Sequence, residues 1–265
     1  MTDRSTSRDN NAREWFEDWF SHPLYLKVYH HRDKAEADLC VETILRITGN
    51  QQSSNSSVLD IACGAGRHAI SLARHGFRVT ANDLSNYLLG EAEKEARNEG
   101  IDLELSCCDM RSINLDRRFD LIVQLFSSFG YFETDEEDQA VIRNVSGMLQ
   151  PDGWYVLDLI NREYLRKRIV PRTEKSVEEL FIVEERELSD RNVCKTITIR
   201  DGNGDECSFS ESVRLYAPEE ISALLKSENL EVKMVAGDYH GSEFNAESSP
   251  RMILFARKQT EATVL

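Results

Sequence analysis

The segment with the clearest chemical content is VLDIACGAGRHAI at Val58–Ile70, where an apolar run leads to an acid and then to two glycines. The run predicts a buried strand, and the residues after Gly66 predict a helix. Glycines at such a junction let a ligand approach the backbone closely. Gly64 and Gly66 match the dinucleotide-binding pattern, but the Asp60 carboxylate would repel a pyrophosphate. A ligand that carries an amine or another cation would suit this acid better.

Two further acids follow later strands. Asp83 comes after the predicted strand Phe77–Ala81, and Asp109 comes after Leu103–Cys107. Open α/β proteins bind ligands at the carboxyl ends of their parallel strands, so the acids should converge there. Asp83 can accept both hydroxyls of an adenosine ribose, and Asp109 can accept the adenine amino group. S-Adenosylmethionine combines that nucleoside with a sulfonium and an ammonium, which Asp60 would attract.

The elements that must position these acids alternate along the chain. Apolar strands alternate with helices from Val58 to Leu159, which predicts an α/β fold with a doubly wound, mostly parallel sheet. From Asn161 the pattern changes to strand-like runs separated by turn residues, which predicts an inserted antiparallel meander. These runs are Val177–Leu188, Val193–Arg200 and Cys207–Tyr216. The expected division is an N-terminal helical lid at 1–48, a core at 49–160 and 217–265, and an inserted cap at 161–216.

The order of these motifs resembles that of class I S-adenosylmethionine-dependent methyltransferases. The matching segments are Val58–Ile70, Val79–Ser85, Cys108–Arg111 and Phe119–Phe132. The resemblance covers about Val58–Leu159 and implies a Rossmann-like, seven-stranded sheet. The sequence SFGYF at 128–132 is similar to that of bacterial small-molecule methyltransferases. Cys63 departs from the glycine that many members have, but it is small enough to fit.

The resemblance also implies which residues hold the cofactor. Asp60 and the two glycines would flank its methionine part, and Gln124, Leu125 and Phe126 would lie along it. Apart from the resemblance, Tyr25 and Tyr29 could form a lid over the cofactor, with an amphipathic surface helix as the alternative. The full expected cofactor set is Asp60, Ala62, Gly64, Gly66, Arg67, Asp83, Leu84, Asp109, Met110, Gln124, Leu125, Phe126, Tyr25 and Tyr29.

Methyl transfer from a sulfonium depends mainly on alignment, and a base is needed only when the nucleophile arrives protonated. Tyr131 is expected at the reacting centre as an aromatic wall, with packing under the next helix as the alternative. His240 is the candidate base, with a surface-loop histidine as the alternative. Residues of the insertion and tail are expected to bind the acceptor, because insertions give one scaffold its substrate. The expected acceptor-binding residues are Phe132, Asn161, Arg162, Arg214, Tyr216 and Arg251.

The net charge of −15 over 265 residues opposes binding to nucleic acid. The six cysteines show no zinc-like spacing, so no metal is expected, and no signal peptide or membrane span is evident. A cytoplasmic monomer or homodimer that methylates N or O of a small molecule fits best. The alternatives are a non-enzymatic S-adenosylmethionine-binding regulator, an RNA or protein methyltransferase, and a nicotinamide-dependent oxidoreductase.

Overall fold

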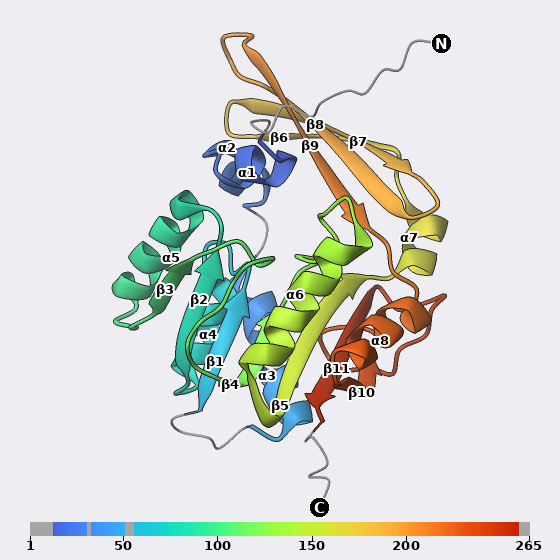
Figure 1. The fold of residues 1–265 in the computed structure, drawn as a ribbon. Helices are drawn as coiled ribbons and strands as arrows, with labels where there is room; N and C mark the ends of the chain where they lie inside the picture. Colours follow the sequence, from blue (N-terminus) through green and yellow to red (C-terminus); the bar gives the residue numbers. More distant parts are fainter. Residues whose placement is uncertain (1–12, 31–32, 51–55, 260–265) are drawn as a thin grey trace, which may run out of the picture.

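The computed structural model describes residues 13–30, 33–50 and 56–259. Its larger sheet has seven strands in the order β10-β11-β5-β4-β1-β2-β3 (Figure 1). The parallel strands are β1 (Ser57–Ile61), β2 (Arg78–Asp83), β3 (Glu104–Cys107), β4 (Phe119–Gln124) and β5 (Leu149–Ile160). Strand β11 (Arg251–Lys258) is antiparallel to both neighbours, β5 and β10 (Leu230–Ala236). The predicted mostly parallel, Rossmann-like sheet is therefore confirmed.

Helices cover both faces of this sheet. They are α3 (Lys34–Thr48), α4 (Arg67–Arg74) and α5 (Asn86–Asn98) on one face, and α6 (Asp135–Met148) and α8 (Pro218–Ser227) on the other. Successive strand residues point to opposite faces. Val58 accordingly packs with α3 and α4, and Leu59 packs with α6 and α8. The side chain of Asp60 therefore lies on the same face as that of Val58.

A smaller antiparallel sheet, the cap sheet, lies between β5 and α8 in the sequence. Helix α7 (Arg162–Arg168) leads into its strands, which pair in chain order: β6 (Arg172–Val177), β7 (Leu180–Leu188), β8 (Asn192–Arg200) and β9 (Glu206–Arg214). The inserted meander is confirmed, but it has one strand more than the sequence pattern predicts. Strand β6 reads RTEKSV and has no buried residue, so it carries no hydrophobic alternation.

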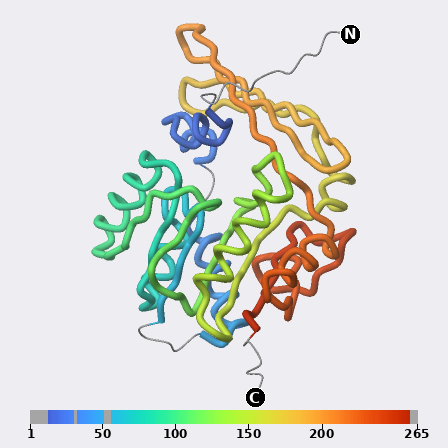
Figure 2. Tube along the Cα trace, viewed as in Figure 1, coloured from blue at the N-terminus to red at the C-terminus, as the bar shows by residue number. Residues whose placement is uncertain are grey.

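Two short helices lie between the two sheets (Figures 1 and 2). They are α1 (Trp15–Phe20) and α2 (Leu24–Val28), and we call them the lid. Their buried residues Trp19 and Val28 pack against Ile182 and Ile197 of the cap sheet. The lid and the cap therefore share one small apolar core, separate from the two cores of the large sheet.

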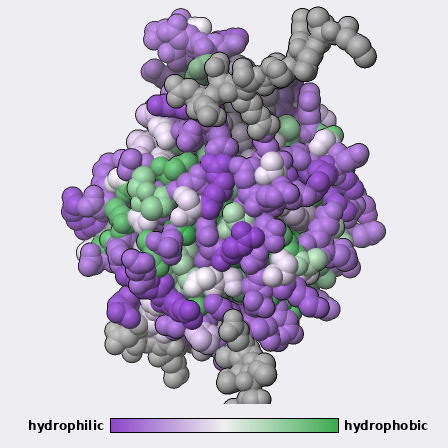
Figure 3. Space-filling model, in the orientation of Figure 1, coloured by the Kyte–Doolittle hydropathy of each residue, from purple (hydrophilic) through white to green (hydrophobic). Residues whose placement is uncertain are grey.

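The face shown in Figure 3 is mostly hydrophilic, with apolar residues in scattered areas. Among the described residues, no helix is long and apolar enough to cross a membrane. The described ranges also contain no cluster of three or more His, Cys, Asp or Glu side chains placed to hold a metal ion.

Candidate active site

The turn between β1 and α4 needs both of its glycines, for different reasons. Gly64 has a φ of +59° and faces open space, so a ligand can reach its backbone. Gly66 has a φ of +78°, and a Cβ there would lie 2.8 Å from the Cβ of Ala92. The first glycine therefore serves the cavity described below, and the second permits α4 to pack closely against α5.

Asp83 ends β2 and is fixed by backbone donors. The N–H of Gly64 donates to one carboxylate oxygen and the N–H of Ser85 to the other, each at 2.8 Å. A carboxylate has about four lone-pair positions, so Asp83 keeps acceptor capacity for a ligand. Burial raises its pKa.

Asp60 is the most unusual acid in the site. It is 1% exposed, and its Oδ2 has no hydrogen-bond partner among the described residues. Burial first, and then the nearby charge of Asp83, raise its pKa to about 8. A cation that approaches this buried carboxyl group would favour its ionised form.

A cavity of about 1320 Å³ extends from these strand ends to the lid and the cap. Its sheet side is lined by Ala62, Cys63, Gly64, Asn82, Asp83, Leu84, Asp109, Met110, Leu125 and Phe126. Its lid and cap side is lined by Trp15, Phe16, Phe20, Tyr25, Tyr29, Thr196, Ser208, Phe209 and Ser210. Ligand pockets usually measure about 300–1,000 Å³. The cavity therefore has room for a cofactor and a second small molecule.

Most residues expected to bind the cofactor line this cavity, including Arg67, whose guanidinium lies 4.4 Å from the centre of the Phe126 ring. Asp60, Gly66 and Gln124 lie behind its wall. Gln124 is fully buried and donates to the Ser128 carbonyl at 2.8 Å, so it supports the loop after β4.

Tyr131 and Phe132 also lie where the sequence places them, at the cavity wall. The ring of Tyr131 meets two lid side chains, Trp15 at 5.1 Å and Phe20 at 5.7 Å between ring centres. Tyr131 therefore lines the cavity and packs against the lid, and its place at the reacting centre stays a prediction.

The expected acceptor residues from the insertion and tail do not line the cavity. Arg162 forms ion pairs with Glu163 and Glu220, and Asn161 donates to the carbonyls of Ala246 and Ser249. These contacts hold α7 and the loop before β11 in place. Both side chains therefore bind neighbouring segments of the protein and lie outside the cavity.

Arg214 and Tyr216 belong to another buried cluster, beside the N-terminus of α6. The Arg214 guanidinium contacts Asp135, and the Tyr216 hydroxyl donates to Asp138 at 2.5 Å. This cluster joins the end of the cap to the core.

His240, the expected base, is exposed on a turn outside the cavity. Its neighbour Tyr239 points inward and donates to Asp158 at 2.8 Å, and the His240 carbonyl accepts from Arg46. His240 lines a smaller hollow with Arg46 and His75 instead. It therefore takes no part in the function proposed below.

Arg251 reaches the site only indirectly. Its guanidinium pairs with the buried carboxylate of Asp158 at 2.7 Å and donates to the Ser127 hydroxyl at 2.7 Å. Asp158 in turn accepts the N–H of Phe126 on Oδ2 and the N–H of Ser127 on its carbonyl. Phe126 and Ser127 have φ values of +60° and +62°, which cost non-glycine residues about 1–3 kcal/mol each. The Asp158–Arg251 pair therefore stabilises a strained turn at the cavity wall.

Two polar residues at the cavity were not predicted. Asn82 precedes Asp83, and Ser128 follows the strained turn. The Oδ1 of Asn82 and the Oγ of Ser128 are buried with no hydrogen-bond partner among the described residues. Both residues lie within predicted motifs, Asn82 in Val79–Ser85 and Ser128 in Phe119–Phe132, which is the signal that would have identified them. Buried polar atoms normally have partners, so these two point to a ligand.

These features fit S-adenosylmethionine. The buried Asp60, with one free oxygen, suits the positive charges of its methionine part. Asp83 and Asn82 keep acceptor capacity for a ribose, and the bare backbone at Gly64 lets the chain of the cofactor pass.

Known proteins resemble this chain in sequence and in fold. Residues 58–153 match the family described as "Methyltransferase domain". The dTDP-3-amino-3,4,6-trideoxy-alpha-D-glucopyranose N,N-dimethyltransferase of Streptomyces venezuelae is 32% identical over 140 residues, which are 47% of this chain and 56% of that protein. The alignment therefore spans little more than half of that relative.

Solved structures resemble nearly the whole fold. An S-adenosylmethionine-dependent methyltransferase from Clostridium acetobutylicum superposes with a TM-score of 0.77 at 23% identity, covering 89% of this chain and 97% of that one. The amino pentose methyltransferase CalS10 from Micromonospora echinaspora, solved with S-adenosylmethionine bound, gives 0.66 at 21% identity, covering 90% and 98%. Residues 58–153 thus resemble a methyltransferase domain. The described chain has the fold of these solved methyltransferase structures, as its sequence predicts.

Proposed function

We propose that this chain transfers the methyl group of S-adenosylmethionine to a nitrogen or oxygen of a small molecule bound beneath the lid and the cap. The observation that carries this proposal is the continuity of the cavity. It begins at the acids on the strand ends and continues to aromatic lid residues and hydroxyl-bearing cap residues. A site for the cofactor alone would not need the part of the cavity that the lid and the cap line.

The residues at the strand ends bind and orient in this scheme. Asp60 offsets positive charge near the β1 turn, Asp83 accepts from the ribose, and Asp109 with Met110 borders the adenine. When bound, the cofactor supplies an activated methyl group that needs no further activation by the protein. The protein therefore contributes mainly alignment, which can lower the barrier substantially.

The second half of the cavity holds the acceptor. Tyr131, Trp15 and Phe20 form an aromatic wall that excludes water and gives the acceptor an apolar surface. Phe209 on β9, which stacks on Trp19 at 4.4 Å between ring centres, extends this apolar surface at the far end. In this proposal α1 and α2 act as the lid and residues 161–216 as the acceptor-binding cap. Helix α3, which the sequence division at 1–48 assigns to the lid, packs on the large sheet instead. All six cysteines are free, which supports a reducing compartment.

A turnover assay tests the proposal. The full chain is incubated with S-adenosylmethionine and a panel of amines and phenols, and S-adenosylhomocysteine is measured by mass spectrometry. Calorimetric titration with S-adenosylmethionine, S-adenosylhomocysteine and NAD runs in parallel. Acceptor-dependent product would support the proposal. Binding of NAD with neither of the other two ligands would refute it.

A further inference from the structure

Asp83 and Asp109 are each joined to a residue two positions later that contacts the lid. Asp83 accepts the N–H of Ser85, and the Ser85 hydroxyl donates to the carbonyl of Phe20 at 3.0 Å. Asp109 accepts from the backbone and guanidinium of Arg111, and Arg111 pairs with Glu14. Glu14 and Phe20 stand at the two ends of α1. The lid helix is therefore attached at both ends to the loops that would hold adenosine.

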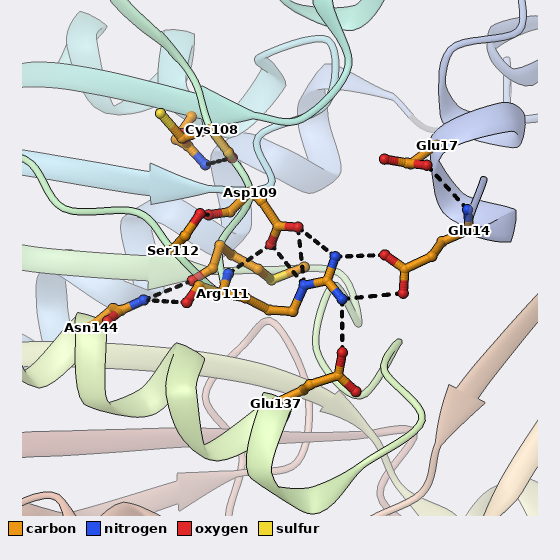
Figure 4. A network of polar contacts seen from close by, with 10 residues as sticks. Glu14, Glu17, Cys108, Asp109, Arg111, Ser112, Glu137 and Asn144 are labelled. Carbon is orange, nitrogen blue, oxygen red and sulfur yellow. Dashed lines mark hydrogen bonds and ion pairs between the residues drawn. The ribbon is translucent and has the colours of Figure 1, made fainter. Parts of the chain in front are cut away.

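The Arg111 contacts are the stronger of the two attachments (Figure 4). Its Nη1 and Nη2 reach the two carboxylate oxygens of Glu14 at 3.2 and 2.5 Å. The same guanidinium donates to Asp109 at 2.6 Å and to Glu137 of α6 at 2.8 Å. One cation therefore holds three carboxylates from three separate elements.

The charges in this cluster make it sensitive to a ligand. Three carboxylates around one guanidinium leave an excess of negative charge, so the acids repel one another. An N–H donor that approaches the Asp109 carboxylate from the cavity and shares its charge would reduce that repulsion. The cluster would then hold Glu14, and with it α1, more firmly. Contacts of α1 with the cap, such as the stacking of Trp19 on Phe209 at 4.4 Å, do not involve these acids.

We propose that Arg111 and Ser85 are positioning residues that dock α1 in response to adenosine at Asp83 and Asp109. Docking brings Trp15 and Phe20 against Tyr131 and so completes the acceptor wall. The cofactor would then bind before the acceptor. By linkage, docking of α1 must raise the affinity for the nucleoside by the same factor. This inference rests on the proposed function, because it assumes an adenosyl ligand at these acids.

The test uses S-adenosylhomocysteine as the probe, which needs no acceptor. Hydrogen exchange of the α1 amides is measured on the full chain with and without the probe, and affinity is measured by calorimetry. Wild-type protein should show at least about fivefold slower exchange in α1 when the probe is bound. Glu14→Gln should abolish most of that extra protection and weaken probe binding about threefold to tenfold. Arg111→Met should reduce the protection of α1 and the affinity for the probe by at least as much.

Arg97→Met is the matched control, because Arg97 is exposed on α5 and pairs with Glu93 at the surface. It should retain the wild-type response. A merely structural role for Arg111 would lower the melting temperature but leave the probe-dependent protection unchanged. If Arg111→Met does not fold, Glu14→Gln decides the question alone. It is a milder change, since the Glu14 N–H still donates to the Glu17 carboxylate.

The inference is overturned if Glu14→Gln binds the probe with wild-type affinity and shows the same protection of α1. A wild-type chain that does not bind the probe at all is a different result. It would refute the proposed function, on which the inference depends.

Discussion

The buried carboxylate of Asp60 predicts that cofactor binding becomes tighter as the pH rises through neutrality. In the free protein its pKa is raised to about 8, first by burial and then by the charge of Asp83. Below that pH the carboxyl is mostly protonated and offers no charge to a cationic ligand. Binding of a cation favours the ionised form, so the proton must leave. Asp60→Asn removes the titration while keeping the size of the side chain.

The magnitude follows from the pKa. If only the ionised form binds, the apparent affinity scales with the ionised fraction, which rises about 25-fold between pH 6.0 and 7.5 for a pKa of about 8. That change corresponds to ~1.9 kcal/mol and is an upper bound, because the neutral form retains other contacts. The window stops at pH 7.5 because the ligand's own amino group titrates near pH ~8.

Calorimetric titration with S-adenosylmethionine across this window measures the slope. At pH 7 the wild-type protein should release close to one proton on binding, which appears as a dependence of the heat on the buffer's ionisation enthalpy. Asp60→Asn should bind with nearly constant affinity, close to the wild-type value at pH 6.0. Asp102→Asn, at an exposed position before β3, should keep the wild-type slope.

The stability of the free protein gives a second, independent check. An acid whose pKa is raised in the folded state stabilises the fold below its unfolded pKa, and this contribution is lost as the pH rises toward 8. Asp60→Asn should therefore lose less stability between pH 5 and 8 than the wild type in thermal denaturation. If Asp60→Asn keeps the wild-type slope in the binding titration, the proton comes from another group, such as Asp83, and the role given to Asp60 is wrong.

Three further substitutions test other parts of the site. Asp83→Ala should weaken S-adenosylmethionine binding by ~1–3 kcal/mol, as expected for a lost hydrogen bond to a charged group, and unchanged affinity in a folded variant would contradict the ribose assignment. Gly66→Ala should destabilise the fold by ~1–3 kcal/mol in urea denaturation, because its Cβ would lie 2.8 Å from that of Ala92; a wild-type midpoint would contradict the packing argument. Arg251→Met should cost ~3–5 kcal/mol in the same assay, since the buried Asp158 carboxylate loses its cation, and a loss under 1 kcal/mol would show that the pair is dispensable.

The large sheet and its row of acids could be predicted because local sequence encodes them. The strand at Val58 and the glycines after it combine a hydrophobic period with residues of unusual backbone freedom. Asp83 and Asp109 follow from that prediction, because parallel strands bring their carboxyl ends to one edge. Strand β6 was not predicted, because its residues alternate between exposed and half-buried positions and so show no apolar pattern.

The acceptor residues could not be predicted, because their positions depend on contacts far apart in the sequence. His240 and Tyr239 are adjacent in a turn, and only tertiary packing decides which of them points inward. Arg251 shows the same difficulty in a strand. The register of β11 and β5 pairs Ile253 with Asp158. Arg251 precedes Ile253 by two residues and so lies on the same face of the sheet, diagonally across from Asp158 and within its reach. No local sequence pattern indicates such a register.

The strained turn after β4 explains why Arg251 matters although it does not line the cavity. Phe126 and Ser127 adopt left-handed conformations that their own side chains disfavour, so the turn persists only because other groups fix it. Asp158 fixes its backbone, and Arg251 neutralises the charge that Asp158 would otherwise bury alone. The turn places Ser128 at the cavity wall, where its hydroxyl has no hydrogen-bond partner among the described residues. A basic residue near the end of the chain thus shapes the site through an acid and a strained turn. A search for residues that touch the ligand would therefore find Ser128 and miss the pair that places it.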